Sequence, residues 1–322
     1  MTVMKFMENS DFICPVCKNA VLSRSFEAKD YISSEPFVVY KCSHCGSAVI
    51  KLQSPGKGIV EYYNERYYGR RKSFVENFIN YGREMEVMKF AKEKPSPPFL
   101  LDIGCGNGTF LMSMRACGWS AVGTEIAPPE HLLIGAKSFI YKGDLKGQKF
   151  ANNSFNAITM WHSLEHLSDL QEYLVEIKRI LRPEGVLIIE VPNFQSLQAI
   201  IFKENWFHLD VPRHLFHFSP KGITLLLKEI GFSEIRVFPG SFIYEFFGYL
   251  QSILNVLTKR KNLLFDFLNH KIAWRDVYKK HFKDLALNAI VLVPAAIISV
   301  FLFVVALVAG KSGIMGVSAR KS

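Results

Sequence analysis

The hydrophobic and polar positions predict alternating strands and helices between residues 99 and 240. Short apolar runs of strand length occur at 99–103, 120–125, 139–142, 155–160, 186–191 and 232–238. Apolar residues recur at helical spacing at 109–117, 170–181 and 219–230. This alternation is typical of a mostly parallel sheet with helices on both faces. We therefore expect an α/β domain over residues 99–240.

The first predicted strand leads into a glycine-rich turn. Residues 99–111 read FLLDIGCGNGTFL, in which Asp102 precedes Gly104, Gly106 and Gly108. Glycine permits positive φ and lets the backbone pass close to a ligand. Strand, turn and helix together form a nucleotide-sized crevice at the carboxyl end of a parallel sheet. The dinucleotide pattern G-x-G-x-x-G does not fit, because the third glycine here follows after one residue. An ordinary glycine-rich turn is the alternative.

The spacing hydrophobic-Asp-x-Gly-x-Gly-x-Gly resembles motif I of the class I S-adenosylmethionine (SAM)-dependent methyltransferases, which have a Rossmann-like fold. The resemblance implies that Asp102 lies near the methionyl end of SAM and that the three glycines pass under it. Glu125 ends the second strand 23 residues beyond Asp102, where a carboxylate can accept hydrogen bonds from a ribose diol. Asp144 resembles the family position whose acid meets the adenine amino group, with a plain turn residue as the alternative.

Four of the six cysteines form two C-x-x-C pairs, Cys14 with Cys17 and Cys42 with Cys45, separated by 24 residues. Two such pairs can present four thiolates tetrahedrally to one zinc ion. No signal peptide is visible, so we expect the amino-terminal part to stay in the cytosol, where disulfide scaffolds are rare. Four unliganded cysteines are the alternative, and a thioredoxin-type redox pair fits less well.

A zinc ribbon followed by a tyrosine-rich segment and then motif I resembles a group of bacterial methyltransferases. Many of that group are associated with surface-polysaccharide and modified-sugar pathways. Tyr62, Tyr63, Tyr67 and Tyr68 either help to close over a substrate or pack the ribbon on the main domain.

Candidate catalytic residues follow the fourth and fifth predicted strands. Residues 161–167 read WHSLEHL at the carboxyl end of a central strand, where side chains face the crevice. A histidine near neutral pKa suits proton acceptance during methyl transfer. We favour His166 as the base and His214 second, and a structural role suits either equally well. The insert at 206–218, which holds three histidines among aromatics, is expected to face the substrate, with metal binding as the alternative.

Beyond Gly240 the pattern departs from the family, because no candidate for the usual antiparallel seventh strand is evident. Apolar residues recur at helical spacing over 242–257 with polar residues opposite, which predicts an amphipathic helix buried in the protein or, as we favour, in a membrane interface. Residues 285–310 contain no charge, a run long enough to span a bilayer or to form a re-entrant hairpin near Pro294.

Most of the net charge of +10 lies in the same region. Residues 257–322 hold eleven Lys and Arg against three Asp, a net +8 that leaves +2 for the rest. Basic residues beside an apolar segment suit anionic lipid head groups, and no nucleic acid is expected as a partner. Most of them precede the apolar run, so the positive-inside tendency predicts a single-pass or re-entrant anchor in the cytoplasmic membrane, with the catalytic domain on the cytoplasmic side.

These features predict an order of segments: a zinc ribbon (1–60), a helical linker (61–98), a methyltransferase domain (99–240), membrane-proximal helices (241–283), an anchor (284–310) and a tail (311–322). The expected activity is O-methylation of a membrane-associated, sugar-containing acceptor such as a lipid-linked glycan. The alternatives are a quinone-type lipid methyltransferase, an RNA methyltransferase that uses the ribbon, and a non-catalytic membrane scaffold. The sequence leaves the oligomeric state open.

Overall fold

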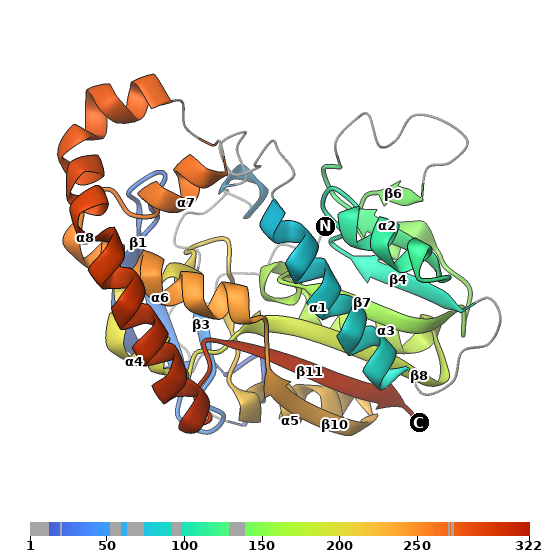
Figure 1. The fold of residues 1–322 in the computed structure, drawn as a ribbon. Helices are drawn as coiled ribbons and strands as arrows, with labels where there is room; N and C mark the ends of the chain where they lie inside the picture. Colours follow the sequence, from blue (N-terminus) through green and yellow to red (C-terminus); the bar gives the residue numbers. More distant parts are fainter. Residues whose placement is uncertain are drawn as a thin grey trace. The chain divides into compact units, whose positions relative to one another are not determined.

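The computed structural model describes residues 13–19, 21–51, 59–62, 74–91, 98–128, 139–269, 271 and 274–322. The chain folds as two units, each assembled from segments far apart in sequence (Figure 1). The ribbon unit comprises residues 1–72, 192–222 and 242–314, and the sheet unit comprises residues 73–191, 223–241 and 315–322. The sequence predicted consecutive segments, whereas the units interleave along the chain.

The sheet unit is built on seven strands in the order β10-β11-β8-β7-β4-β5-β6. The five strands β4 to β8 run parallel, and β10 and β11 are antiparallel to each other. Their bounds are β4 Phe99–Ile103, β5 Ser120–Glu125, β6 Ile140–Lys142, β7 Phe155–Trp161, β8 Leu181–Pro192, β10 Phe232–Pro239 and β11 Ile314–Lys321. This is the predicted Rossmann-like α/β fold.

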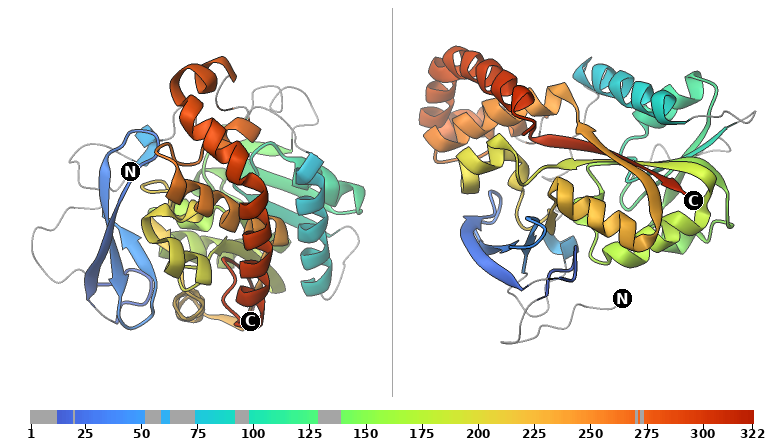
Figure 2. Two further views of the ribbon diagram at one scale, coloured as in Figure 1. Left: turned by 60° about the vertical axis from the view of Figure 1, so that its left-hand side comes forward. Right: turned by 90° about the horizontal axis from the view of Figure 1, so that it is seen from below.

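Helices cover both faces of this sheet (Figure 2, right). They are α1 Phe74–Phe90, α2 Thr109–Ala116, α3 Leu170–Ile180 and α5 Pro220–Ile230, with short turns η3 Lys146–Gln148 and η4 Leu164–His166. The hydroxyl of Ser219 caps α5 by accepting the N–H of Gly222. Helix α1 falls in the predicted linker, but Val87 and Phe90 are buried in the core of the sheet unit, so it is part of that unit.

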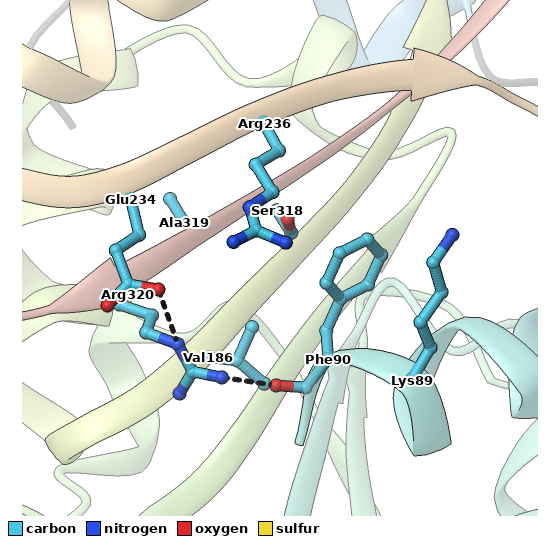
Figure 3. Close-up of a pocket in the computed structure, with 8 residues that line it drawn as sticks. All are labelled: Lys89, Phe90, Val186, Glu234, Arg236, Ser318, Ala319 and Arg320. Carbon is cyan, nitrogen blue, oxygen red and sulfur yellow. Dashed lines mark hydrogen bonds and ion pairs between the residues drawn. The ribbon is translucent and has the colours of Figure 1, made fainter. Parts of the chain in front are cut away.

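The seventh strand, β11, comes from residues that sequence analysis treated as a tail. It lies between β10 and β8 and pairs along β10 from Phe232 with Lys321 to Pro239 with Met315. Arg320 anchors it by donating to the carbonyl of Phe90 at 2.6 Å and pairing with Glu234 at 3.3 Å (Figure 3). The strand is buried along nearly its whole length, so residues 314–321 are an integral part of the sheet unit.

The ribbon unit contains a four-stranded sheet in the order β1-β2-β3-β9, of which β1 and β2 form the long hairpin seen in Figure 2. Its elements are β1 Leu22–Lys29, β2 Pro36–Cys42, β3 Ala48–Ile50, η1 Ile59–Tyr62, α4 Leu197–Phe202, η5 Lys203–Asn205, η6 Phe207–Leu209, β9 Phe216–His217, α6 Phe242–Leu257, α7 Leu263–Leu268 and α8 Trp274–Val308. Tyr62 is buried and donates to Glu35 at 3.0 Å, so it packs the ribbon. Tyr63, Tyr67 and Tyr68 lie outside the described residues.

Helix α6 has the predicted bounds, but its polar residues are buried. Gln251 donates to Asn255 at 2.9 Å and accepts the N–H of Phe265, and Glu245 accepts the N–H of Ile314 at 3.0 Å. The sequence favoured a membrane interface for this helix. The structure instead buries much of it within the ribbon unit, because its polar side chains find hydrogen-bond partners there.

Helix α8 packs along α6 (Figure 1) and bends at His281, where the backbone is not helical. Pro294 lies inside the helix, so residues 285–308 do not form the re-entrant hairpin that was an alternative. Among the described residues, the part from His281 to Val308 is the one helix long and apolar enough to cross a membrane.

Candidate active site

The turn after β4 has the conformation that its glycines predict. Gly104, Gly106 and Gly108 all have positive φ, between 55° and 76°. A Cβ on Gly104 would lie 2.8 Å from Cβ of Ser163, and one on Gly108 would lie 2.8 Å from a side-chain carbon of Ile140. A Cβ on Gly106 would meet nothing within 4 Å. The outer glycines are therefore required by packing, whereas the middle one borders open space that a ligand can occupy.

Asp102, at the end of β4, is buried and accepts a hydrogen bond from the hydroxyl of Thr159 at 2.7 Å. Burial raises the pKa of Asp102 to about 7, although Thr159 and the charge of Arg83 oppose the rise. A cationic ligand group beside this carboxyl would stabilise its charged form. The methionyl amine and the sulfonium of SAM are both cationic.

The other two predicted cofactor acids also lie at the carboxyl ends of the parallel strands. Glu125 Oε2 accepts the N–H of Gly106 at 2.9 Å, which joins the end of β5 to the glycine turn. Asp144 follows β6 and accepts the N–H of Gly147 at 2.9 Å. The turn role considered for Asp144 is therefore present, and its place beside the same edge of the sheet also suits adenine binding.

A cluster of ionisable side chains, in which Glu165 and Glu190 are buried and His162 is mostly buried, lies at the ends of β7 and β8. His162 follows β7 with φ of 54°, a conformation that is rare for residues other than glycine and is common at functional sites. Its Nε2 lies 3.3 Å from Glu190 of β8, and its Nδ1 lies 3.5 Å from Glu165. Burial opposes a charge on the imidazole, but the hydrogen bonds with Glu165 and then Glu190 outweigh it and raise the pKa of His162 to about 9. At neutral pH His162 is therefore a cation held by carboxylates.

Sequence analysis did not select His162, Glu165 or Glu190. Glu190 had a detectable signal, since it is the one charged residue in the apolar run 186–191. A charge in a buried strand requires a partner, and His162 is the residue that immediately follows the adjacent strand β7. The hydroxyl of Ser163 donates to the carbonyl of Ile103 at 2.8 Å, which brings this cluster beside the glycine turn.

The two histidines proposed as bases belong to different units. His166 ends η4 in the sheet unit and is partly exposed. His214 belongs to the ribbon unit, is buried, and bonds through Nδ1 to the carbonyl of His208 at 2.9 Å. The catalytic roles of both remain predictions.

The insert at 206–218 was expected to face the substrate, and this expectation stays a prediction. Several of its polar side chains bond within the ribbon unit. Arg213 has no exposed surface and lies 2.7 Å from both Asp30 and Asp210. The ring of His217 bonds to the carbonyl of Leu209 at 2.8 Å. Arg213 therefore joins the insert to the β1–β2 hairpin through Asp30.

The four ribbon cysteines are buried and close together, with their Sγ atoms all within 4.8 Å of one another. Cys14 Sγ lies 3.8 Å from Cys45 Sγ, and Cys17 Sγ lies 3.7 Å from Cys42 Sγ. A tetrahedral zinc ion with Zn–S bonds of about 2.3 Å places its sulfur ligands about 3.8 Å apart. The donor set and its spacing therefore fit such an ion.

Comparison with known proteins agrees with this geometry. Residues 78–237 match a family model described as a methyltransferase domain. Demethylmenaquinone methyltransferase of Chlorobaculum parvum is 28% identical over 56% of this chain and 82% of that protein. A ubiquinone biosynthesis O-methyltransferase of Cereibacter sphaeroides is 26% identical over 49% of this chain and 71% of its own length.

Among solved structures, a phosphoethanolamine N-methyltransferase of Haemonchus contortus bound to SAM aligns with 94% of this chain and 68% of that one. The TM-score is 0.50 and the sequence identity is 13%, a likeness that concerns the fold alone.

We expect Gly106→Arg to abolish SAM binding, because the long side chain would fill the open space beside the glycine turn. Calorimetry should show an affinity at least about 100-fold weaker than that of the unchanged protein. Gly118→Arg is the matched control, since Gly118 also has positive φ and open space but lies before β5, at the opposite edge of the sheet. Unchanged binding by Gly106→Arg would contradict the assignment.

The raised pKa of His162 predicts a pH-dependent stability. The ordinary histidine pKa is 6.5 and the folded value is about 9. The stabilisation by the charged imidazole is therefore complete below pH 6.5 and is lost as the pH rises through 9, a loss of about 3 kcal/mol. Urea unfolding at several pH values should show that the advantage of the unchanged protein over His162→Gln shrinks across this range. His44→Gln, at an exposed histidine of the ribbon unit, is the control for the loss of an imidazole.

Proposed function

Because the chain is a class I SAM-dependent methyltransferase, we propose that it methylates a hydroxyl group of a lipid-linked glycan held at the cytoplasmic face of a membrane. The observation that carries the membrane part of this proposal is the apolar helix α8, whose surface from Ile290 to Val308 is largely exposed. An enzyme and an acceptor confined to one surface meet at a higher effective concentration than two soluble partners do.

A quinone-type acceptor is the second candidate, and the names of the relatives favour it. Demethylmenaquinone and ubiquinone methyltransferases are among the similar proteins. Both candidate acceptors carry a polar head on a long lipid chain. The ribbon suits the glycan acceptor, since the sequence resemblance to polysaccharide-associated methyltransferases includes it. An RNA acceptor fits less well, because the basic excess is confined to residues 257–322.

The proposed transfer is an in-line displacement at the sulfonium methyl group. The acceptor oxygen forms a bond to the methyl carbon, the carbon–sulfur bond breaks, and S-adenosylhomocysteine leaves. The hydroxyl proton passes to a base, for which we propose His166. His162 does not suit this task, because its pKa of about 9 keeps it protonated at neutral pH. It instead forms ion pairs with Glu165 and Glu190 at the carboxyl end of the sheet.

We also propose that Cys14, Cys17, Cys42 and Cys45 bind one structural zinc ion. The sulfur spacing supports this, as does the N–H of Cys45 directed at Cys42 Sγ at 3.4 Å. Four thiolates complete a tetrahedral shell, so such an ion would stabilise the ribbon and leave no open position for chemistry.

The zinc site predicts one equivalent of metal per chain. Elemental analysis of protein purified without chelator should give close to one zinc, and Cys42→Ser should lose most of it. Cys117→Ser, which changes an exposed cysteine outside the cluster, should keep full zinc content. Equal metal content in both variants would contradict the proposed ligands.

The proposed base predicts that His166→Ala binds SAM with unchanged affinity but turns over at least about 100-fold more slowly. Ser168→Ala, an exposed change two residues further along the same loop, should retain activity. The assay uses full-length enzyme, membrane extracts as the source of acceptor, and SAM carrying a labelled methyl group. Label in a glycolipid fraction supports the first candidate, and label in the quinone fraction supports the second. Full turnover by His166→Ala would remove this residue from the mechanism.

A further inference from the structure

Helix α8 presents a continuous apolar stripe on the side away from α6. The side chains of this outer stripe recur every three or four residues and are between 49% and 85% exposed: Ile290, Val293, Ile297, Phe301, Val304 and Val308. The opposite side of the helix is buried and carries small or polar residues, namely Asn288, Ala295, Ser299 and Ala306. The helix is therefore two-sided, with small residues toward the protein and large apolar ones outward.

The amino-terminal end of this apolar region is bonded to the ribbon unit. Asp284 accepts the backbone N–H groups of Lys259 and Arg260 at 3.2 and 3.1 Å. These two residues lie in the connection between α6 and α7. The first turn of the apolar region is thus fixed beside the carboxyl end of α6.

The carboxyl-terminal end of α8 is bonded to the same unit. The carbonyl of Lys311 accepts the N–H of Leu197, the first residue of α4, at 3.0 Å. The Asn193 side chain donates to the carbonyl of Ser312 at 2.9 Å. Between the two ends, Ala295 packs with Leu250 and Leu254 of α6. The apolar region of the helix is therefore held at both ends and at its middle.

These contacts bear on how the helix meets a membrane. A spanning helix places its ends on opposite sides of a hydrocarbon layer about 30 Å thick. Both ends of α8 are bonded to one folded unit, which also contains the hairpin and the buried Arg213 with its two carboxylates. Such a unit cannot enter the bilayer, because its charged groups and strand edges have no place in hydrocarbon. A spanning orientation would require α8 to leave the unit.

We propose that α8 lies in the plane of an anionic lipid surface and immerses its outer stripe from one side, without crossing. Charge complementarity selects anionic lipid as the occupant. Lys283 and Lys311 are exposed at the two ends of the apolar region, and eight Lys and Arg residues from Lys259 to Lys283 precede it in the sequence. Basic residues at both ends of an apolar face suit a helix that meets head groups along its full length. Like the proposed function, this inference requires a membrane surface, but it does not depend on which acceptor is methylated.

The first test measures binding of the full-length protein to vesicles of phosphatidylglycerol and phosphatidylcholine by co-flotation, with no acceptor or SAM present. The double variant Ile297→Glu with Phe301→Glu should bind at least about tenfold more weakly, because it puts two charges into the stripe. The matched control is Ile200→Glu with Ile201→Glu, two exposed isoleucines of α4, which should bind normally. Melting temperature and SAM affinity should be unchanged in both variants. Equal vesicle binding by the stripe variant would overturn the proposal.

The second test separates an in-plane helix from a spanning one. A fluorophore at residue 290, 297 or 304 should show the same shallow depth by lipid-borne quenchers, whereas successive labels on a spanning helix would differ by about 10 Å. Single cysteines replacing Lys283 and Lys311, in a Cys117→Ser background, should both react with an impermeant maleimide added outside the vesicles. Graded depths, or protection of one end, would overturn the in-plane arrangement.

A dimer of the unchanged protein that the stripe substitutions dissociate, together with no vesicle binding, would also overturn the proposal. That result would assign the stripe to contact between two copies of the chain. None of these measurements requires turnover, so a failure here is distinguishable from a wrong acceptor or a wrong base.

Discussion

The pairing of β11 with β10 is the constraint on which the rest of the structure depends. These two strands are neighbours in the sheet, yet α6, α7 and α8 lie between them in sequence. The chain must leave the sheet after Pro239 and return to it at Met315. Arg320 secures the return through the Phe90 carbonyl and Glu234. Every element in between has to form a unit whose entry and exit lie side by side, which explains why α8 is bonded to its unit at both ends.

The sequence predicted most of the sheet because each parallel strand contains an apolar run of strand length. It did not predict β11. That strand contains Gly316, Ser318 and Arg320, and its burial depends on partners from α1, β8 and β10 that no local pattern contains. Both ends of α6 were predictable from helical spacing. The burial of Gln251 and Asn255 was not, because it depends on hydrogen bonds with α7 and the residues that flank it.

In the candidate site, too, some residues were predictable from the sequence and others were not. The glycine turn with Asp102 and Glu125 is contiguous or regularly spaced, so sequence alone located it. The cluster of His162 with Glu190 joins the ends of two strands, and only their adjacency in the sheet brings the groups within 3.3 Å. The insert shows what sequence alone could not predict. Arg213 is buried between Asp30 and Asp210, a partnership with the β1–β2 hairpin that the local pattern does not contain, and the substrate-facing role of the insert stays a prediction.

The chain leaves the sheet unit at Ser241, which is hydrogen-bonded to the candidate site. Ser241, the residue before α6, donates its N–H to Glu190 at 2.8 Å, and Glu190 is the carboxylate beside His162. At the return, the first residue of β11, Ile314, donates to the buried Glu245 of α6. A backbone shift at Ser241 therefore changes the hydrogen bonding of Glu190, and with it the stability of the His162 charge.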